Sequence, residues 1–217
     1  MSALTCDDTA VANEIKKEYD FYQKEVKPVV DLVELLYDAI PKGLLNEVRS
    51  FTGHICDASI RNDISVEKRL ANVNNAHSHL RRIILDCYKL MCLWYREEIR
   101  IFDKKYRWSD LADVRDGEFV PEYSHLKKEA KNAFLDAKKA ERPGNNDRDK
   151  ADDLGKVYHK YLSAYNAYVA VYDYLDKCDS AVRRAAHKDT RRKVVAVLGW
   201  IVGIVATVIC TFITLEC

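Results

Sequence analysis

Residues 194–215 read VVAVLGWIVGIVATVICTFITL, a stretch of 22 residues without a charged side chain. At about 1.5 Å of rise per residue, a helix of this length covers the roughly 30 Å hydrocarbon core of a bilayer. A helix buried in a protein core seldom runs this far without a polar face. The sequence therefore predicts a single transmembrane helix at 194–215 and makes the lipid bilayer the first expected partner.

Basic residues are concentrated directly before this span. Residues 179–193 contain six basic and two acidic side chains, a local charge of +4. Such residues stay on the cytoplasmic side and are attracted to anionic lipid headgroups. The opening residues MSALTCDDTA are polar and acidic, so we expect no N-terminal signal, insertion driven by the span itself, and a cytoplasmic N-terminal part. The predicted membrane-surface residues are Arg183, Arg184, Lys188, Arg191, Arg192 and Lys193.

Small residues recur every fourth position inside the span, at Gly199, Gly203, Thr207 and Thr211. They would share one helix face, and small side chains allow two membrane helices to approach closely and associate. The alternative interpretation is that glycine is simply common in membrane helices. The stripe favours a homo-oligomer assembled through the span.

The remainder of the chain is predicted to be helical. It contains few glycines and prolines, is rich in Ala, Leu, Lys and Glu, and shows no β-type alternation. Apolar residues in steps of three and four along 65–105, and a row of tyrosines along 151–178, indicate packing seams between helices. The expected helices cover about 7–28, 28–40, 44–60, 65–105, 122–141 and 151–215, with a loop at 106–120 and turns at 141–150.

The predicted fold class is therefore all-α: an elongated helical bundle with a long C-terminal helix that continues into a single transmembrane span. We expect a cytoplasmic helical bundle at 1–178, a basic juxtamembrane stalk at 179–193 and the transmembrane helix at 194–215.

Composition and motifs exclude several classes of function. The formal charge of +1 gives no general field for nucleic acid, so no DNA partner is expected. Seven cysteines without a CxxC pair fit reduced thiols better than disulfides or a zinc site. Motifs for nucleotide binding, metalloproteases and serine hydrolases do not occur. The sequence therefore predicts neither a cofactor nor a metal.

Two polar stretches stand out on the helices expected at 44–60 and 65–105. On the first, Glu47, His54 and Asp57 share a face with two other polar residues; on the second, His79 does so with Arg82 and Asp86. His77 occupies an apolar seam position. Because the two helices are joined by a short turn, they are expected to be antiparallel neighbours. The candidate polar network is either structural or a binding or catalytic site, and it comprises Glu47, Asp57, His77, His79, Arg82 and Asp86.

Arg49 and His54 have the spacing R-x4-H, and on a regular helix their side chains would splay apart by about 140°. R-x4-H in an all-α bundle resembles the HEPN superfamily, whose active members are metal-independent ribonucleases. The resemblance implies that His54 acts as acid or base at a 2′-hydroxyl and that Arg49 stabilises the phosphate. The chain departs from the family pattern at Ser50 and Gly53.

Some HEPN-like proteins carry a transmembrane helix and act beside CRISPR effectors as oligomeric membrane-permeabilising proteins, and this chain is similar in plan. The resemblance implies a membrane-anchored oligomeric effector in antiviral defence, activated by a protein or RNA partner. The alternatives are a membrane-tethered ribonuclease and a non-enzymatic tail-anchored adaptor. Oligomer number separates the effector from the adaptor, because a single span cannot conduct alone.

Overall fold

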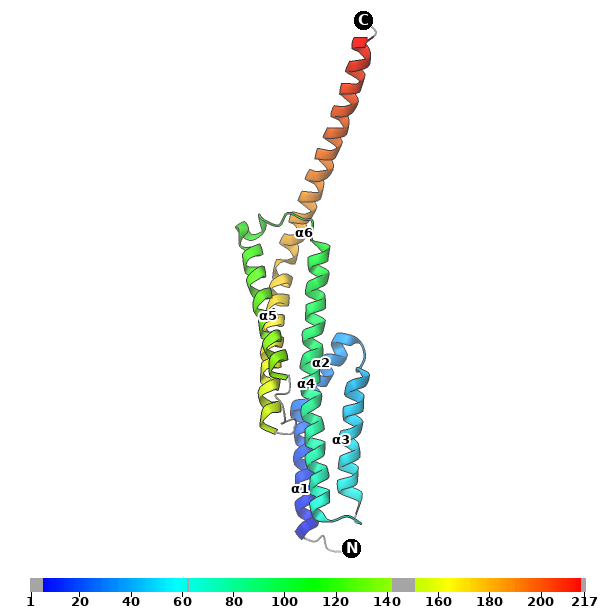
Figure 1. Cartoon of the computed structure of the whole chain (residues 1–217), viewed down its shortest axis with the longest axis vertical. Helices are drawn as coiled ribbons and strands as arrows, with labels where there is room; N and C mark the ends of the chain where they lie inside the picture. The colour runs from blue at the N-terminus through cyan, green and yellow to red at the C-terminus, as the bar shows by residue number, and fades with distance from the viewer. Residues whose placement is uncertain (1–5, 62, 142–150, 216–217) are drawn as a thin grey trace. The chain divides into compact units, whose positions relative to one another are not determined.

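The computed structural model describes the backbone of residues 6–61, 63–141 and 151–215, and the side chains of 8–61, 63–141 and 157–207. The described residues contain helices and no strand, so the predicted all-α class is confirmed, as is the long C-terminal helix (Figure 1). The elements are α1 (Cys6–Phe21), the π-helical turn η1 (Tyr22–Val26), α2 (Lys27–Tyr37), α3 (Lys42–Ile60), α4 (Val66–Lys105), the 3₁₀ turn η2 (Val114–Gly117), α5 (Phe119–Glu141) and α6 (Ala151–Leu215).

The chain divides into two compact units, each built from two separate segments. The first unit comprises residues 1–97 and 128–169, and the second comprises residues 98–127 and 170–217. Three helices, α4, α5 and α6, contribute residues to both units.

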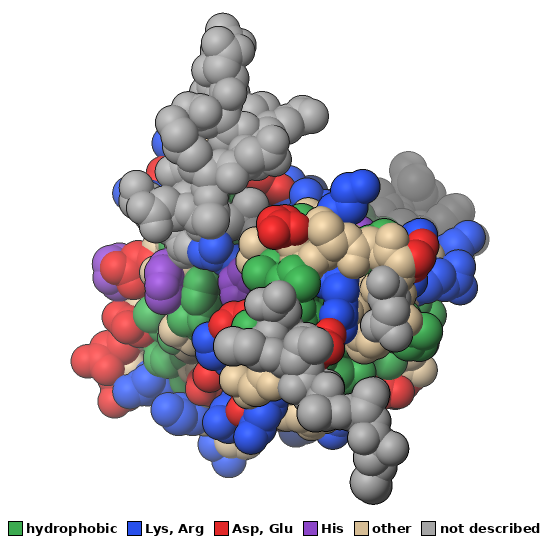
Figure 2. Space-filling model, turned by 90° about the horizontal axis from the view of Figure 1, so that it is seen from below, with side chains coloured by type: hydrophobic (Ala, Val, Ile, Leu, Met, Phe, Trp, Pro, Cys, Tyr) green, Lys and Arg blue, Asp and Glu red, His purple; other side chains and the backbone are tan. Residues whose placement is uncertain are grey.

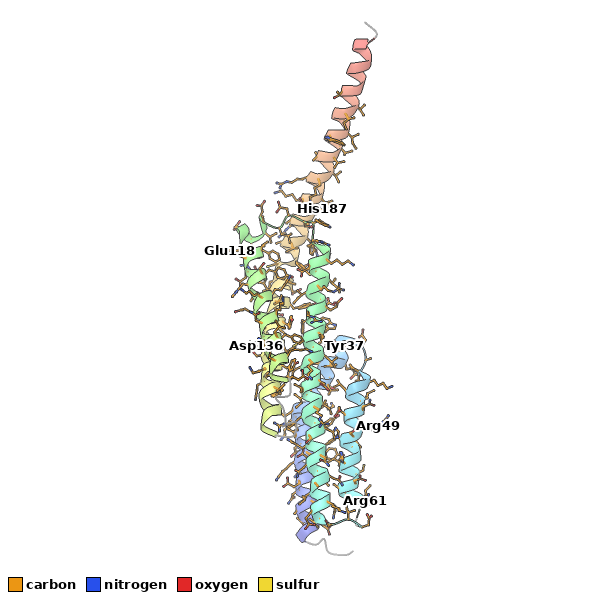
Figure 3. The ribbon with its side chains drawn as sticks, viewed as in Figure 1. Tyr37, Arg49, Arg61, Glu118, Asp136 and His187 are labelled. Carbon is orange, nitrogen blue, oxygen red and sulfur yellow. The ribbon has the colours of Figure 1, made fainter. Side chains whose placement is uncertain are left out.

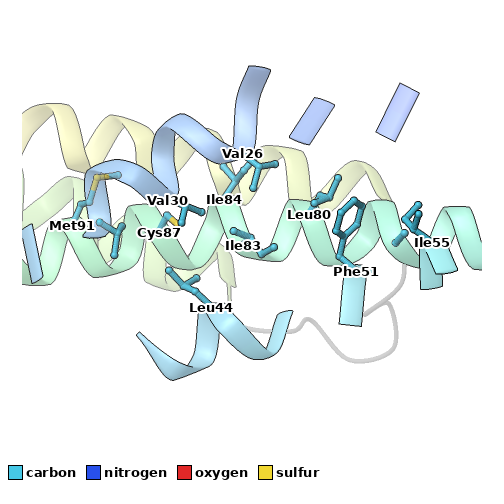
Figure 4. Close-up of a cluster of buried hydrophobic side chains, with 12 residues drawn as sticks. Val26, Val30, Leu44, Phe51, Ile55, Leu80, Ile83, Ile84, Cys87 and Met91 are labelled. Carbon is cyan, nitrogen blue, oxygen red and sulfur yellow. The ribbon is translucent and has the colours of Figure 1, made fainter. Parts of the chain in front are cut away.

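The core of the first unit is an apolar cluster centred on α4. On this helix Leu80, Ile83 and Cys87 are buried, and their steps of three and four place them on one face. Residues from α3, including Leu44 and Phe51, pack against this face (Figure 4). The α3–α4 pair is thereby fixed as neighbours, and this pairing positions the polar residues discussed below.

Pro28 interrupts the first helix, as the sequence predicts, but the chain continues through a π-helical turn that the sequence does not predict. The amide of Lys27 donates to the carbonyl of Tyr22, five residues back, so the chain forms a wider π-helical turn here. In a regular α-helix the ring of Pro28 would clash with the carbonyl four residues earlier. The wider turn relieves this clash, and Pro28 then occupies the first turn of α2, where its missing N–H costs nothing.

The core of the second unit is largely aromatic. Phe119 is buried and stacks on Tyr123 and Tyr174, with ring centroids 5.7 and 5.8 Å apart. Phe102 packs edge-on against Tyr123 at 5.5 Å. The hydroxyl of Tyr123 donates to Asp103 over 2.7 Å. Together these contacts join the end of α4, the start of α5 and the adjoining part of α6.

The row of tyrosines on α6 supplies part of the core. Tyr161 and Tyr168 are buried, Tyr165 is half-buried and Tyr172 is exposed. In the first unit Tyr165 packs against Tyr88 of α4, with ring centroids 5.5 Å apart. The row therefore packs partly against α4, as the seam interpretation proposes.

Gly53 lies inside α3, is exposed, and has no atom within 4 Å of the place that a Cβ would occupy. A helix-interior glycine costs about 0.5–1 kcal/mol relative to alanine. We therefore predict that Gly53→Ala raises the free energy of unfolding by that amount, measured by urea denaturation of the full chain in detergent. Gly117→Ala is the matched control and should destabilise, because Gly117 has a φ of +90°. A loss of stability in Gly53→Ala would contradict the described helix.

Candidate functional site

A cluster of polar side chains lies between α3 and α4 in the first unit. The Nδ1 atom of His79 lies 2.6 Å from Oε2 of Glu47. The rings of His54 and His79 stack, with centroids 5.3 Å apart and planes 23° apart. The Nδ1 atom of His54 lies 3.3 Å from Oδ1 of Asn72. Two residues of α3 and two of α4 are thereby brought together, and we call them the histidine cluster.

The apolar seams of the two helices set this geometry. On α3, Glu47 and His54 each follow a buried residue, Leu44 and Phe51, by three positions, so they line the edge of the packed face. On α4, His79 likewise follows buried Ala76 by three positions. The histidine cluster therefore lies at the rim of the core, where all its members are partly buried.

The sequence correctly indicates that polar residues of the two stretches meet, but only Glu47, His54 and His79 do so. Asp57 and Arg82 are exposed. The Nδ1 atom of His77 lies 2.9 Å from Glu18 of α1 instead. Asp86 accepts a hydrogen bond from Lys89 over 3.2 Å. The predicted network is thus divided among different sides of α4.

Arg49 does not join the histidine cluster. It is exposed on α3 (Figure 3), and no hydrogen bond or ion pair ties it to another described residue. α3 is an uninterrupted α-helix from Lys42 to Ile60, so the five-residue spacing keeps Arg49 and His54 splayed apart. Within one chain the R-x4-H pair does not converge on a common point, and a phosphate held by both residues would require a second chain.

A second polar cluster, which the sequence does not indicate, connects α4, α5 and α6 in the first unit. The hydroxyl of buried Tyr161 donates to Oε2 of Glu141 over 2.6 Å, and Lys89 donates to the other carboxylate oxygen. Burial and the hydrogen bond to Glu141 raise the pKa of Tyr161. Burial alone would raise the pKa of Glu141, but the hydrogen bonds from Lys89 and Tyr161 outweigh it and lower that pKa. Among the described residues, both carboxylate oxygens of Glu141 accept a hydrogen bond, which gives this cluster a structural role between the three helices.

Two of the described cysteines lie in surroundings that keep their thiols protonated. Cys87 and Cys92 are buried, and burial raises the pKa of each thiol to about 12, which keeps both unreactive at neutral pH. Cys56 and Cys178 are also free thiols. In the part of the chain whose side chains are described, no group of His, Cys, Asp and Glu residues is arranged to hold a metal ion.

The basic residues before the predicted span are exposed on α6, and only two of them form ion pairs with described residues. Arg183 pairs with Asp179 at 2.8 Å, and Lys193 pairs with Asp189 at 2.6 Å. The other predicted membrane-surface residues, Arg184, Lys188, Arg191 and Arg192, form no ion pair with any described residue. Figure 2, by contrast, shows basic and acidic side chains interspersed over the described part of the face that it presents.

The predicted span begins as exposed helix. Every residue from Arg191 to Thr207 is exposed, including Gly199 and Gly203, and the hydroxyl of Thr207 donates to the carbonyl of Gly203 over 2.8 Å. No helix is long and apolar enough to cross a membrane when only the residues with described side chains are counted. Residues 208–215 of the predicted span, Thr211 among them, lie outside those residues.

Comparisons of the chain with protein-family models, with curated proteins and with solved structures found no match.

The paired carboxylate of Glu141 gives a testable pH dependence. Its pKa in the folded chain lies below the ordinary value of 4.5, so its stabilising contribution is present above pH 4.5 and is lost as the pH falls through the folded value. We predict that Glu141→Gln lowers the free energy of unfolding by about 1 kcal/mol at pH 7, after allowance for solvent screening. The difference from the parent chain should shrink as the pH falls below 4.5.

Thermal unfolding in detergent, followed by circular dichroism across this pH range, measures the effect. Glu34→Gln is the matched control, because Glu34 is exposed on α2 and forms no ion pair with a described residue. A Glu141→Gln difference that stays constant from pH 7 to pH 3 would show that ionisation of Glu141 does not stabilise the fold.

Proposed function

We propose that the chain is a membrane-anchored helical effector that acts as a homo-oligomer. In this proposal residues 194–215 span a bilayer, residues 179–193 lie at anionic headgroups on the cytoplasmic side, and the helical part is held at that surface. The observation that carries the proposal is the uncovered apolar surface of α6 after Lys193.

This surface extends around the whole helix. Val195, Trp200 and Val205 follow one another at intervals of five residues, so each is rotated by about 140° from the one before. Their exposed fractions are 69%, 72% and 51%. A protein groove would cover one side of such a helix, whereas lipid covers all sides. The pattern therefore supports a bilayer over a soluble partner.

The unpaired basic residues support the same placement. Arg184, Lys188, Arg191 and Arg192 precede the apolar stretch and form no ion pair with described residues. Each basic residue near an anionic membrane surface contributes about 1 kcal/mol of attraction. Their side chains line a recess on α6 whose remaining wall includes Val195 and Ala196, so charge and apolar surface adjoin at the expected interface.

Self-association is proposed through the small-residue face. No atom lies within 4 Å of the place that a Cβ would occupy at Gly199 or at Gly203, so this face is open in the single chain. Because the Thr207 hydroxyl is bonded within its own helix, Thr207 would act through its small size. Close backbone approach along such a face favours association in lipid.

Membrane permeabilisation is the activity that we propose for this oligomer. Its assignment to antiviral defence, with an activating protein or RNA partner, rests on the resemblance to HEPN-like membrane effectors. The ribonuclease alternative needs Arg49 and His54 to meet across two chains. The adaptor alternative needs the span only as an anchor, and it predicts a monomer or dimer.

We predict that Val202→Arg together with Val205→Arg abolishes membrane integration. The span contains 13 Val, Ile, Leu and Phe residues, each contributing about 0.3–0.6 kcal/mol to insertion. Two arginines at the centre of the span cost about 5–7 kcal/mol of insertion free energy, which offsets that gain. A single arginine would cost about half as much, so the span could still insert. Flotation of the expressed chain with vesicles, followed by carbonate extraction, measures integration. The matched control is Val202→Leu with Val205→Leu, and integration of the arginine variant would contradict the span.

A second prediction concerns assembly. Gly199→Leu with Gly203→Leu should reduce the oligomer to monomers, because leucine prevents close approach of the backbones. The single chain should be undisturbed, since both positions face open space. Light scattering of the detergent-solubilised protein, corrected for bound detergent, gives the subunit number.

Val194→Phe with Val205→Phe is the matched control, because it adds bulk to the same helix on the face opposite the stripe. A parent assembly of six or more subunits that releases dye from vesicles, and a leucine variant that does not, would support permeabilisation. A parent chain that is monomeric or dimeric in detergent and lipid would leave the adaptor as the better account.

A further inference from the structure

We propose that the connection between α4 and α5 forms a second contact with the bilayer, in which Trp108 lies among the lipid headgroups beside Lys193. This inference rests on the proposed membrane span of α6. It adds a contact from a segment about 85 residues away in the sequence, which the apolar stretch alone does not indicate.

Two hydrogen bonds within the second unit tie this connection to α6, and a third, within α6, joins the two α6 side chains that take part in them. The ammonium group of Lys193 donates to the carbonyl oxygen of Trp108 over 2.5 Å and to Asp189 over 2.6 Å. The amide of Asp110 donates to the same Asp189 carboxylate over 3.2 Å. Residues 108–110 are therefore held against the last turn of α6 before Val194, the first residue of the expected span.

The indole of Trp108 is directed to solvent. Its exposed fraction is 78%, although Tyr106, two residues earlier, is buried. The guanidinium of Arg107 lies 4.9 Å from the indole ring. Tryptophan is enriched at membrane interfaces, where its ring meets the apolar boundary and its N–H stays hydrated. An exposed tryptophan whose backbone is held beside the expected entry point of the span suits that environment.

The surrounding charge favours an anionic lipid surface. Residues 104–113 and 189–193 together contain six basic and three acidic side chains, a local charge of +3. One of the acids, Asp189, is already bound by Lys193 and by the amide of Asp110. The lysines and arginines of this set are Lys104, Lys105, Arg107, Arg191, Arg192 and Lys193.

The geometry also predicts how deep the indoles of Trp108 and Trp200 lie in the bilayer. Trp200 follows Lys193 by seven residues and therefore lies about 10 Å farther along the helix axis. Trp108 should sit at the headgroups, while Trp200 should lie among the acyl chains. The two indoles thus report separately on the connection and on the span.

Tryptophan fluorescence of the full chain in vesicles of phosphatidylcholine and phosphatidylglycerol tests this inference. The chain has three tryptophans, so W94F/W200F leaves Trp108 and W94F/W108F leaves Trp200. We expect lipids labelled with a quencher near the headgroup to quench Trp108 at least twofold more than lipids labelled deep in the acyl chain. Trp200 should show the reverse.

Lys193→Met tests the hydrogen bond between Lys193 and the carbonyl of Trp108. Arg192→Met is the matched control, because the Arg192 variant also loses one positive charge but keeps that hydrogen bond. Lipid quenching of Trp108 should fall in the first variant and persist in the second, with Trp200 unchanged in both. Quenching of Trp200 without Trp108 would overturn this inference and leave the span intact. Absence of lipid quenching at both positions would overturn the inference and the proposed function together.

Discussion

The apolar surface of α6 after Lys193 is the constraint on which our account depends. From Val194 to Thr207 the helix carries large aliphatic side chains on every side, and all of them are exposed in the single chain. Water disfavours such a surface by about 25 cal/mol for each Å² left uncovered. A bilayer removes this cost for the whole circumference, and copies of the same helix can then meet along its small-residue face. The arrangement of the basic residues before this apolar surface, and of Trp108 beside it, is consistent with placing the surface in a bilayer.

The buried and half-buried polar residues before the juxtamembrane stretch 179–193 are explained by their role in joining neighbouring helices. Arg69 is buried and donates to the carbonyl of Ala58, near the end of α3, where helix carbonyls lack partners, and to Asp8. Glu141 is paired with Lys89 and Tyr161, and Glu47 with His79. Each pairing links neighbouring helices and satisfies groups that burial would otherwise penalise. The histidine cluster has the same character, so the proposed function rests on the C-terminal part of α6 instead.

Helix positions follow closely from the sequence, because proline, glycine and apolar spacing act locally. Pro28 signals an interruption, but the sequence does not show that a π-helical turn accommodates it. The sequence predicts that α5 begins at about residue 122, after Pro121, but the helix begins three residues earlier, at Phe119. The reason is that proline is tolerated within a first helical turn. The face-sharing of Glu47 and His54 is local too, and their meeting with His79 followed from the short turn between α3 and α4.

Long-range pairings could not be predicted in the same way. Nothing near Glu141 in the sequence identifies Lys89, 52 residues away, as its partner. The same holds for His77, which sequence periodicity places in an apolar seam but which pairs with Glu18 of α1. Trp108 stands in an apparent loop, and its relation to Lys193 depends on the tertiary fold of the second unit. Such pairs require the packing of distant helices, whereas local patterns constrain one helix at a time.

The most direct measurement is amide hydrogen exchange of the full chain in lipid vesicles, read peptide by peptide along α6. Our account predicts that amides of 194–207 are strongly protected, while those of 183–193, which precede the expected span, exchange much faster, because lipid excludes water only from the span. Detergent micelles should give the same boundary at Lys193. Exchange of 194–207 as fast as that of 183–193 in vesicles would contradict the account, because it would place this apolar helix outside the bilayer.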